Sequence, residues 1–233
     1  ATTQVAALTA AQIGTLTTTE VQTFSTAQAG AFTATQLGGL TTTAIGNFST
    51  TQLAALTTAQ TQGFSTTQLN ALSGTNLNAL DASEFSTGQV SGLTTTAISS
   101  LSTTEVGTLS SAQVGALTAA QIGTLTTTEV RAFTTTQASG LTATQLGGLT
   151  NSALSNFTTT QFSQFTTAQS QGLTTSQLNA LSQTNLNALD ANELSTDQVS
   201  GLTTTVITNL TTTQVITLTA GQIGALTTTQ ATF

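Results

Sequence analysis

Most of the acidic residues of this chain fall in two short segments, and these are its best candidates for metal chemistry. They are Asp81 and Glu84 in the first segment, and Asp190, Glu193 and Asp197 in the second. A hard cation such as Ca²⁺ prefers several oxygen ligands, so each group could form a weak calcium site. The spacing matches helix capping better, because an acid at a helix N-terminus binds the free backbone N–H groups there. We therefore expect the acids at 81, 84, 190 and 193 to be structural caps, with no bound metal and no cofactor.

The chain offers little for catalysis. It has no His and no Cys, and Arg131 is its single basic residue. A catalytic pair of carboxylates needs a cleft that separates the two pKa values, whereas these acids should lie one helical turn apart on a narrow repeat structure. Ser and Thr occur throughout, so none of them stands out as a nucleophile. The sequence predicts that the protein is not an enzyme.

A repeated eight-residue segment must position these acids, and LTTTEVQT, residues 16–23, is a typical copy. Thr17 can accept from the backbone N–H of Glu20, and the Glu20 carboxylate can accept from the N–H of Thr17. These two bonds form a capping box. Leu16 and Val21 flank it as the apolar pair that fixes how the chain enters a helix. The octad therefore predicts a helix of five or six residues.

Copies of this repeat, two of them shortened, begin 29 times along the chain, always with Leu or Phe and then Thr, Ser or Asp. Its fifth residue is Gln or Glu in 23 copies. The six exceptions are Ala44, Asn76, Ala97, Ala153, Asn185 and Val206. This regularity predicts one element for each octad along the whole chain.

The spacing of the apolar residues decides between two kinds of solenoid. They recur five and then three residues apart, whereas a half-buried strand requires alternation. Helices this short do not form alone, because helix nucleation is costly, so they must stack on their neighbours. We predict an all-α solenoid of very short capped helices. The alternative is a β-solenoid, since Thr and Val favour strands.

A longer period is superimposed on the octads. Within one continuous array, 1–233, the segments 8–116 and 117–225 are two super-repeats of equal length and closely similar sequence. Each consists of 13 octads and one pentad, at 80–84 and 189–193. Each pentad lacks the last three residues of an octad, so we expect a local change of phase or direction there.

Composition limits the partners. The formal net charge is −7 and only 4% of residues are charged. A chain with one basic residue does not bind nucleic acid, because phosphate contacts need Lys or Arg clusters. No apolar stretch is long enough to insert into a membrane. Low charge gives little repulsion between copies, so we expect self-association through side or end contacts.

The octads LTAAQIGT, LSTTEVGT and LTTTQVIT resemble the Leu-Thr-x-x-Gln-aliphatic arrays of very large secreted bacterial repeat proteins, often labelled adhesin-like, hemagglutinin-like or haemolysin-type. This resemblance implies an extracellular or cell-surface location. We expect a structural role as a stalk, a spacer or a self-assembling surface fibre (filament). The alternative is an adhesion module whose Thr/Gln-rich face binds a glycan or a surface protein, or, less favoured, ice.

Overall fold

The computed structural model describes residues 2–232, and these form two compact units, 2–116 and 117–232. The division falls at the boundary between the two super-repeats. We call them unit 1 and unit 2 and describe each by itself.

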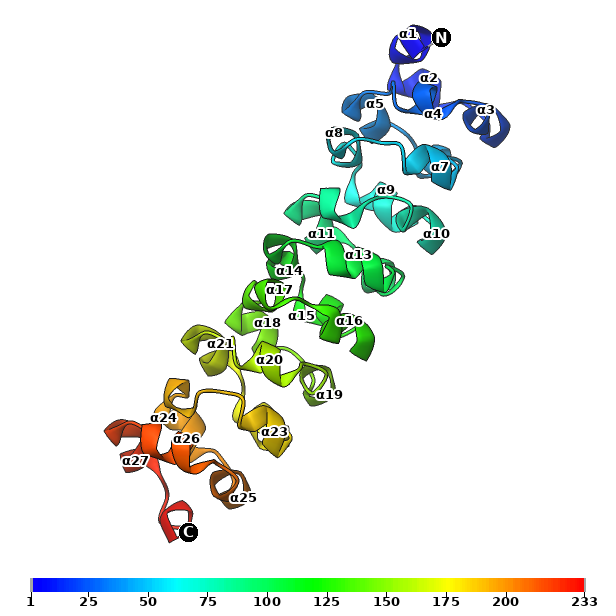
Figure 1. Ribbon diagram of the computed structural model, residues 1–233. Helices are drawn as coiled ribbons and strands as arrows, with labels where there is room; N and C mark the ends of the chain where they lie inside the picture. Colours follow the sequence, from blue (N-terminus) through cyan, green and yellow to red (C-terminus); the bar gives the residue numbers. More distant parts are fainter. Residues whose placement is uncertain (1, 233) are drawn as a thin grey trace. The chain divides into compact units, whose positions relative to one another are not determined.

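Unit 1 consists of short helices joined by turns of two to four residues (Figure 1). They are α1 Thr2–Ala6, α2 Ala10–Gly14, α3 Thr18–Gln22, α4 Thr26–Ala29, α5 Ala34–Gly38, α6 Thr42–Gly46, α7 Thr50–Leu53, α8 Thr58–Thr61, α9 Thr66–Ala71, α10 Gly74–Leu77, the 3₁₀ helix η1 Ala82–Glu84, α11 Thr87–Gly92, α12 Thr95–Ser99, α13 Thr103–Thr108 and α14 Ser111–Ala116.

Unit 2 is built in the same way. Its elements are α15 Ala119–Ile122, α16 Thr127–Ala132, α17 Thr135–Ser139, α18 Ala143–Gly147, α19 Asn151–Leu154, α20 Thr159–Phe162, α21 Thr167–Gly172, α22 Thr175–Ala180, α23 Gln183–Leu186, η2 Ala191–Glu193, α24 Thr196–Ser200, α25 Thr204–Thr208, α26 Thr212–Thr217, α27 Ala220–Ala225 and η3 Gln230–Thr232.

The predicted fold class is confirmed. One α-helix of four to six residues forms in each octad before residue 226, and the last octad and the two pentads hold 3₁₀ helices of three residues. Residues 2–232 contain no strand, so the β-solenoid alternative is wrong. None of the helices in this range has the length and hydropathy needed to cross a membrane.

Each turn of the solenoid contains three octads. The strongest contacts join helices three positions apart, as α4 with α7 and α5 with α8 in unit 1, and α18 with α21 in unit 2. A side chain in one octad therefore meets the backbone around the start of the octad three before it. Gln52 meets Phe24, the first residue of that octad, and Val21, three residues upstream. The octad pattern alone did not predict the number of octads in a turn.

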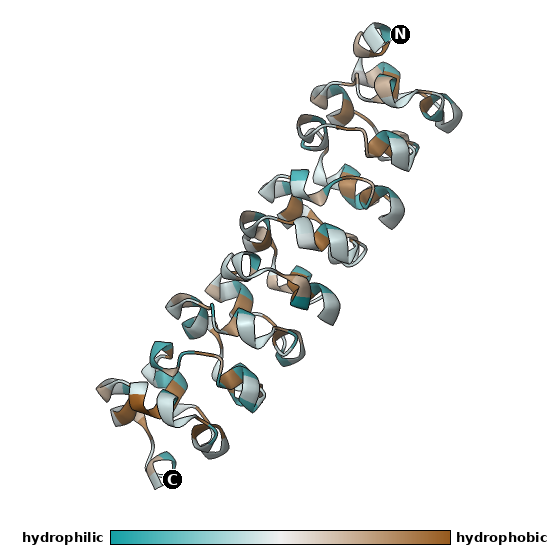
Figure 2. Cartoon of the chain, viewed as in Figure 1, coloured by the Kyte–Doolittle hydropathy of each residue, from teal (hydrophilic) through white to brown (hydrophobic). Residues whose placement is uncertain are grey.

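The first and sixth octad positions form the core. Leu40 and Ile45 are 5% and 0% exposed, and the same alternation of large aliphatic and aromatic residues continues through both units. Figure 2 shows these residues as brown segments on otherwise pale or teal helices. Thr61 and Ser170 also occupy sixth positions and are fully buried, although they are polar.

The backbones of successive turns approach closely at equivalent glycines in the two units. A Cβ on Gly63 would lie 2.6 Å from the carbonyl oxygen of Ala34, and one on Gly172 would lie 2.6 Å from that of Ala143. No larger residue fits between these backbones without moving a turn.

Candidate functional site: the interface between turns

The capping box is the local element on which the interface between turns is built. The Thr17 hydroxyl accepts from the N–H of Glu20 at 3.3 Å, and the Glu20 carboxylate accepts from the N–H of Thr17 at 2.7 Å. The backbone N–H of Thr17, and then its hydroxyl, lower the pKa of the Glu20 carboxyl below its usual value. Most octads use Gln in place of this Glu and keep the same geometry.

Gln52 shows why Gln is preferred. Its side-chain oxygen accepts from the N–H of Ser49 at 2.8 Å, which completes the box. Its Nε2 donates to the carbonyl oxygens of Val21 at 2.9 Å and Phe24 at 2.8 Å, one turn earlier. These carbonyls lie at the end of one short helix and before the next, where the helix hydrogen-bond pattern stops. That of Val21 also accepts from the N–H of Phe24 at 3.2 Å. One side chain therefore caps its own helix and satisfies the preceding turn.

The same amide bond recurs in both units, always with a backbone carbonyl of the preceding turn as the acceptor. The donors include Gln36, Gln60, Gln68, Gln89 and Gln113 in unit 1, and Gln145, Gln161, Gln169, Gln177, Gln198, Gln214, Gln222 and Gln230 in unit 2. All of them are buried. Because a buried polar group without a partner is costly, these bonds hold the turns in one register.

Sequence reasoning missed this second role, although a signal was present. A capping box accepts Gln or Glu, yet the fifth position has Gln 18 times and Glu 5 times. Only Gln has an N–H₂ group that can donate to a carbonyl. The excess of Gln therefore indicates that an acceptor faces this position.

The pentad acids differ from the prediction. Asp81 caps η1 by accepting from the N–H of Ser83 at 2.9 Å. Glu84 was expected to bond back to Asp81, and this is wrong. Its two carboxylate oxygens accept from the hydroxyls of Thr58 at 2.9 Å and Thr61 at 3.0 Å, in the preceding turn.

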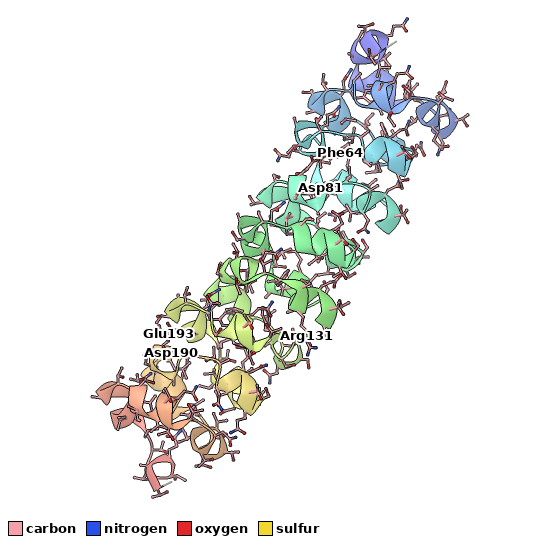
Figure 3. All side chains as sticks on the ribbon, in the orientation of Figure 1. Phe64, Asp81, Arg131, Asp190 and Glu193 are labelled. Atoms are coloured by element: carbon pink, nitrogen blue, oxygen red, sulfur yellow. The ribbon has the colours of Figure 1, made fainter. Side chains whose placement is uncertain are left out.

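Unit 2 repeats this arrangement. Asp190 accepts from the N–H of Asn192 at 3.3 Å. Glu193 also does not bond back to its cap, and accepts from the hydroxyls of Thr167 and Ser170 at 3.0 and 3.1 Å. Figure 3 shows Asp190 and Glu193 close together in this segment. In both units, the buried hydroxyl at the sixth position therefore has a carboxylate of the next turn as its acceptor.

The pentad fills one complete octad position. Gln89, just after it, donates to the carbonyls of Thr61 and Phe64 at 2.9 and 2.8 Å, 28 and 25 residues earlier (Phe64 and Asp81 are labelled in Figure 3). Elsewhere the separations are 31 and 28 residues, as for Gln52. The difference equals the three missing residues, so three octad positions per turn are retained across the pentad.

The candidate metal ligands do not converge. Asp197 is exposed in the first turn of α24, while Glu84 and Glu193 are occupied by hydroxyl donors. Among residues 2–232, no three acidic residues come together in a way that could hold an ion.

Comparisons with known proteins agree with the repeat. Residues 83–119 and 98–127 match the ALTTAQ repeat family. The matched part is a Thr- and Gln-rich repeat region that covers the end of the first pentad and the octads after it. No curated protein matches the chain. Among solved structures, the leucine-rich repeat-containing protein LegL7 from Legionella pneumophila is 15% identical, over 84% of this chain and 78% of that one. The TM-score is 0.20, which does not define a common fold.

Proposed function

We propose that the chain is an extracellular structural repeat protein, which acts as a spacer or stalk whose length is set by the number of octads. The observation that supports this most directly is the repeated bond from a Gln amide to the preceding turn. It occurs from Gln36 to Gln230 with little change, and each turn contacts its near neighbours. Arrays of this kind extend by adding repeats, because stability comes from neighbouring contacts.

The side-chain chemistry fits a passive role. The acids and hydroxyls with distinctive positions are used in caps and in bonds between turns, as Glu84 is with Thr58 and Thr61. The proposal therefore includes no catalysis. The extracellular or cell-surface location rests on the resemblance of the octads to secreted arrays and on the low fraction of charged residues, 4%. Labelling intact source cells with an antibody to the chain tests it: signal without permeabilisation is expected, and signal only after permeabilisation would contradict it.

Small-angle scattering tests the spacer role. The chain is compared with a longer one that carries a second copy of residues 117–225. A spacer gains maximum dimension in proportion to the added repeats, whereas the radius of a compact globule grows only as about the 0.38 power of length. Globular scaling would overturn the proposal. Binding of the monomer to glycans, measured on the same sample, would favour the adhesion alternative.

A further inference from the structure

Some octads near the pentads begin a helix without a capping box of their own. Ala97 and Val206 stand at the fifth position of their octads and have no side-chain oxygen to offer. Glu105 has a carboxylate, but it accepts from the N–H of Ala82 in the preceding turn at 2.7 Å, and not from its own N-cap. In these three octads the N–H of the N-cap residue therefore needs an acceptor from elsewhere.

An asparagine of the preceding turn supplies this acceptor. The Oδ1 of Asn70 accepts from the N–H of Thr94, the N-cap of α12, at 2.8 Å, and its Nδ2 donates to the carbonyl of Gly92 at 3.0 Å. In unit 2, Asn179 accepts in the same way from the N–H of Thr203, the N-cap of α25, at 2.9 Å. One amide side chain thus takes over the part of the capping box that the fifth residue leaves unfilled.

Asn78 does the same for α13, the helix whose glutamate bonds elsewhere. Its Oδ1 accepts from the N–H of Ser102, the N-cap, and its Nδ2 donates to the carbonyl of Ser100, both at 2.5 Å. Each of these asparagines is the seventh residue of its octad and precedes the N-cap that it serves by 24 residues. Each connection spans a pentad, at 80–84 or 189–193, so side chains join the turns on its two sides.

Asn187 provides a natural control for this relation. It is the equivalent of Asn78 in unit 2, but the octad that it faces has Gln214 at the fifth position. Gln214 accepts from the N–H of its own N-cap, Thr211, at 3.0 Å and completes a capping box. The Oδ1 of Asn187 is buried and has no hydrogen-bond partner in the part of the chain that the structure describes. The asparagine is therefore bonded where the box is missing and unbonded where the box is present.

We propose that the seventh-position asparagine is a cross-turn cap, which replaces a missing capping box and makes the start of one helix depend on the turn before it. A capping box closes within one octad, so it needs no other turn. A cross-turn cap exists only while both turns are in place. Because local openings of a protein occur in cooperative units, these caps place each pentad inside such a unit and not at its edge. This inference goes beyond the spacer role and does not depend on it.

Amide hydrogen exchange of the whole ¹⁵N-labelled chain tests the proposal, with circular dichroism as the check on folding. The reporter is the backbone N–H of Thr94, whose acceptor is the Asn70 side chain. Asn70→Ala should speed its exchange about tenfold, because the N–H loses that acceptor. Ala97→Gln supplies a local box, so in that background Asn70→Ala should change the exchange rate less than about twofold. The N–H of Ile98, inside α12, should follow in the same direction.

A gain of protection gives a second test that does not depend on a weakened chain. Ala44 also leaves its octad without a box, and Gly14 is the seventh-position residue that faces the N-cap, Thr41. A Cβ on Gly14 would lie 3.9 Å from the Thr41 Cγ2, which is an ordinary contact. Gly14→Asn should therefore slow exchange of the Thr41 N–H about threefold or more. The same change in the Ala44→Gln background should have less effect, and this comparison removes the intrinsic effect of replacing Gly.

Asn187→Ala is the matched control in unit 2. It removes an acceptor that has no partner, so exchange of the Thr211 N–H should be unchanged. An acceleration of Thr211 as large as that of Thr94 in Asn70→Ala would overturn the proposal. So would an effect of Asn70→Ala that Ala97→Gln does not reduce, or a Gly14→Asn variant that leaves Thr41 unprotected. If Asn70→Ala loses its helical spectrum, the Gly14→Asn comparison decides alone.

Discussion

An octad and a pentad connect to the preceding turn by opposite chemistry. At the octad, Gln52 donates to the carbonyls of Val21 and Phe24. At the pentad, Glu84 accepts from the hydroxyls of Thr58 and Thr61. In both regions, the side chain at the fifth position of the repeat bonds to the preceding turn. The comparison teaches that residue choice at this position depends on what the preceding turn presents.

Equivalent positions in the two super-repeats support this rule. Glu105 in unit 1 accepts from the backbone N–H of Ala82 at 2.7 Å. Its equivalent in unit 2, Gln214, donates to the carbonyls of Leu186 and Leu189, both at 3.1 Å. Glu therefore faces a donor and Gln faces acceptors, even where the surrounding octads are otherwise alike.

The largest expected effect comes from giving an octad the side chain of the pentad. Gln52→Glu keeps the acceptor for Ser49 but leaves the Phe24 carbonyl without a donor, leaves the Val21 carbonyl with the bond from the N–H of Phe24, and adds a buried charge. We expect a loss of about 3 kcal/mol in the free energy of unfolding, measured by chemical denaturation. Gln12→Glu is the control, because Gln12 is exposed and its amide has no acceptor among the described residues; its stability should change little. Equal losses in the two variants would contradict the role of the amide.

The second prediction concerns Thr61→Val, for which the octad pattern and the structure predict opposite changes in stability. Restoring an aliphatic residue with Thr61→Val would stabilise a regular octad. Here it removes the donor to Glu84, so we expect a loss of about 1 to 2 kcal/mol, measured as the shift in denaturation midpoint. Thr61→Ser keeps the hydroxyl, as Ser170 does in unit 2, and should retain most of the stability. A stabilising Thr61→Val would show that the pairing with Glu84 is incidental.

Giving the pentad the side chain of an octad, with Glu84→Gln, should change the free energy of unfolding less. In Glu84→Gln, the amide oxygen still accepts from one hydroxyl, and the other hydroxyl can rotate to accept from the amide. The expected loss is below about 1 kcal/mol in thermal or chemical unfolding. A loss as large as that of Gln52→Glu would mean that the two connections do not differ in the way described.

The smallest expected effect is the pH dependence of the contribution that Glu20 makes to stability. Hydrogen bonds from Thr17 lower its pKa below the usual value of 4.5 in the folded chain. Its contribution to stability is therefore fully present above the unfolded pKa and is lost as the pH falls through the folded pKa. The difference in stability between the natural chain and Glu20→Gln should be constant near neutral pH and change only below about pH 4.5. A difference that does not vary down to pH 3 would show that the carboxylate bond adds nothing.

The local half of this structure could be predicted from the sequence, and the contacts between turns could not. The octad shows the cap at Thr17, the box with Glu20 and the apolar pair that enters the core, because these interactions span at most five residues. The pairing of Thr61 with Glu84 spans 23 residues and depends on how many octads make one turn. That number follows from how the short helices pack, as at Gly63 against Ala34, and no local pattern encodes it.

The pentads also show that a local sequence pattern does not predict contacts between turns. Their sequence, LDASE and LDANE, contains the cap and an acid at capping distance, so a capping box was the natural prediction. The pentad instead forms a 3₁₀ helix of three residues, in which Asp81 bonds two residues ahead. This leaves Glu84 free to bond to the preceding turn.

The central claim is that the glutamine amides join the turns, and hydrogen exchange of those side-chain amides tests it most directly. Two-dimensional NMR of the ¹⁵N-labelled chain resolves side-chain N–H₂ signals, and Gln52→Glu and Gln12→Glu each remove one pair and so assign it. The account predicts that the Gln52 amide protons exchange far more slowly than those of Gln12, because the buried Gln52 amide donates to the carbonyls of Val21 and Phe24. Exchange of Gln52 at the rate of the exposed Gln12 would contradict it.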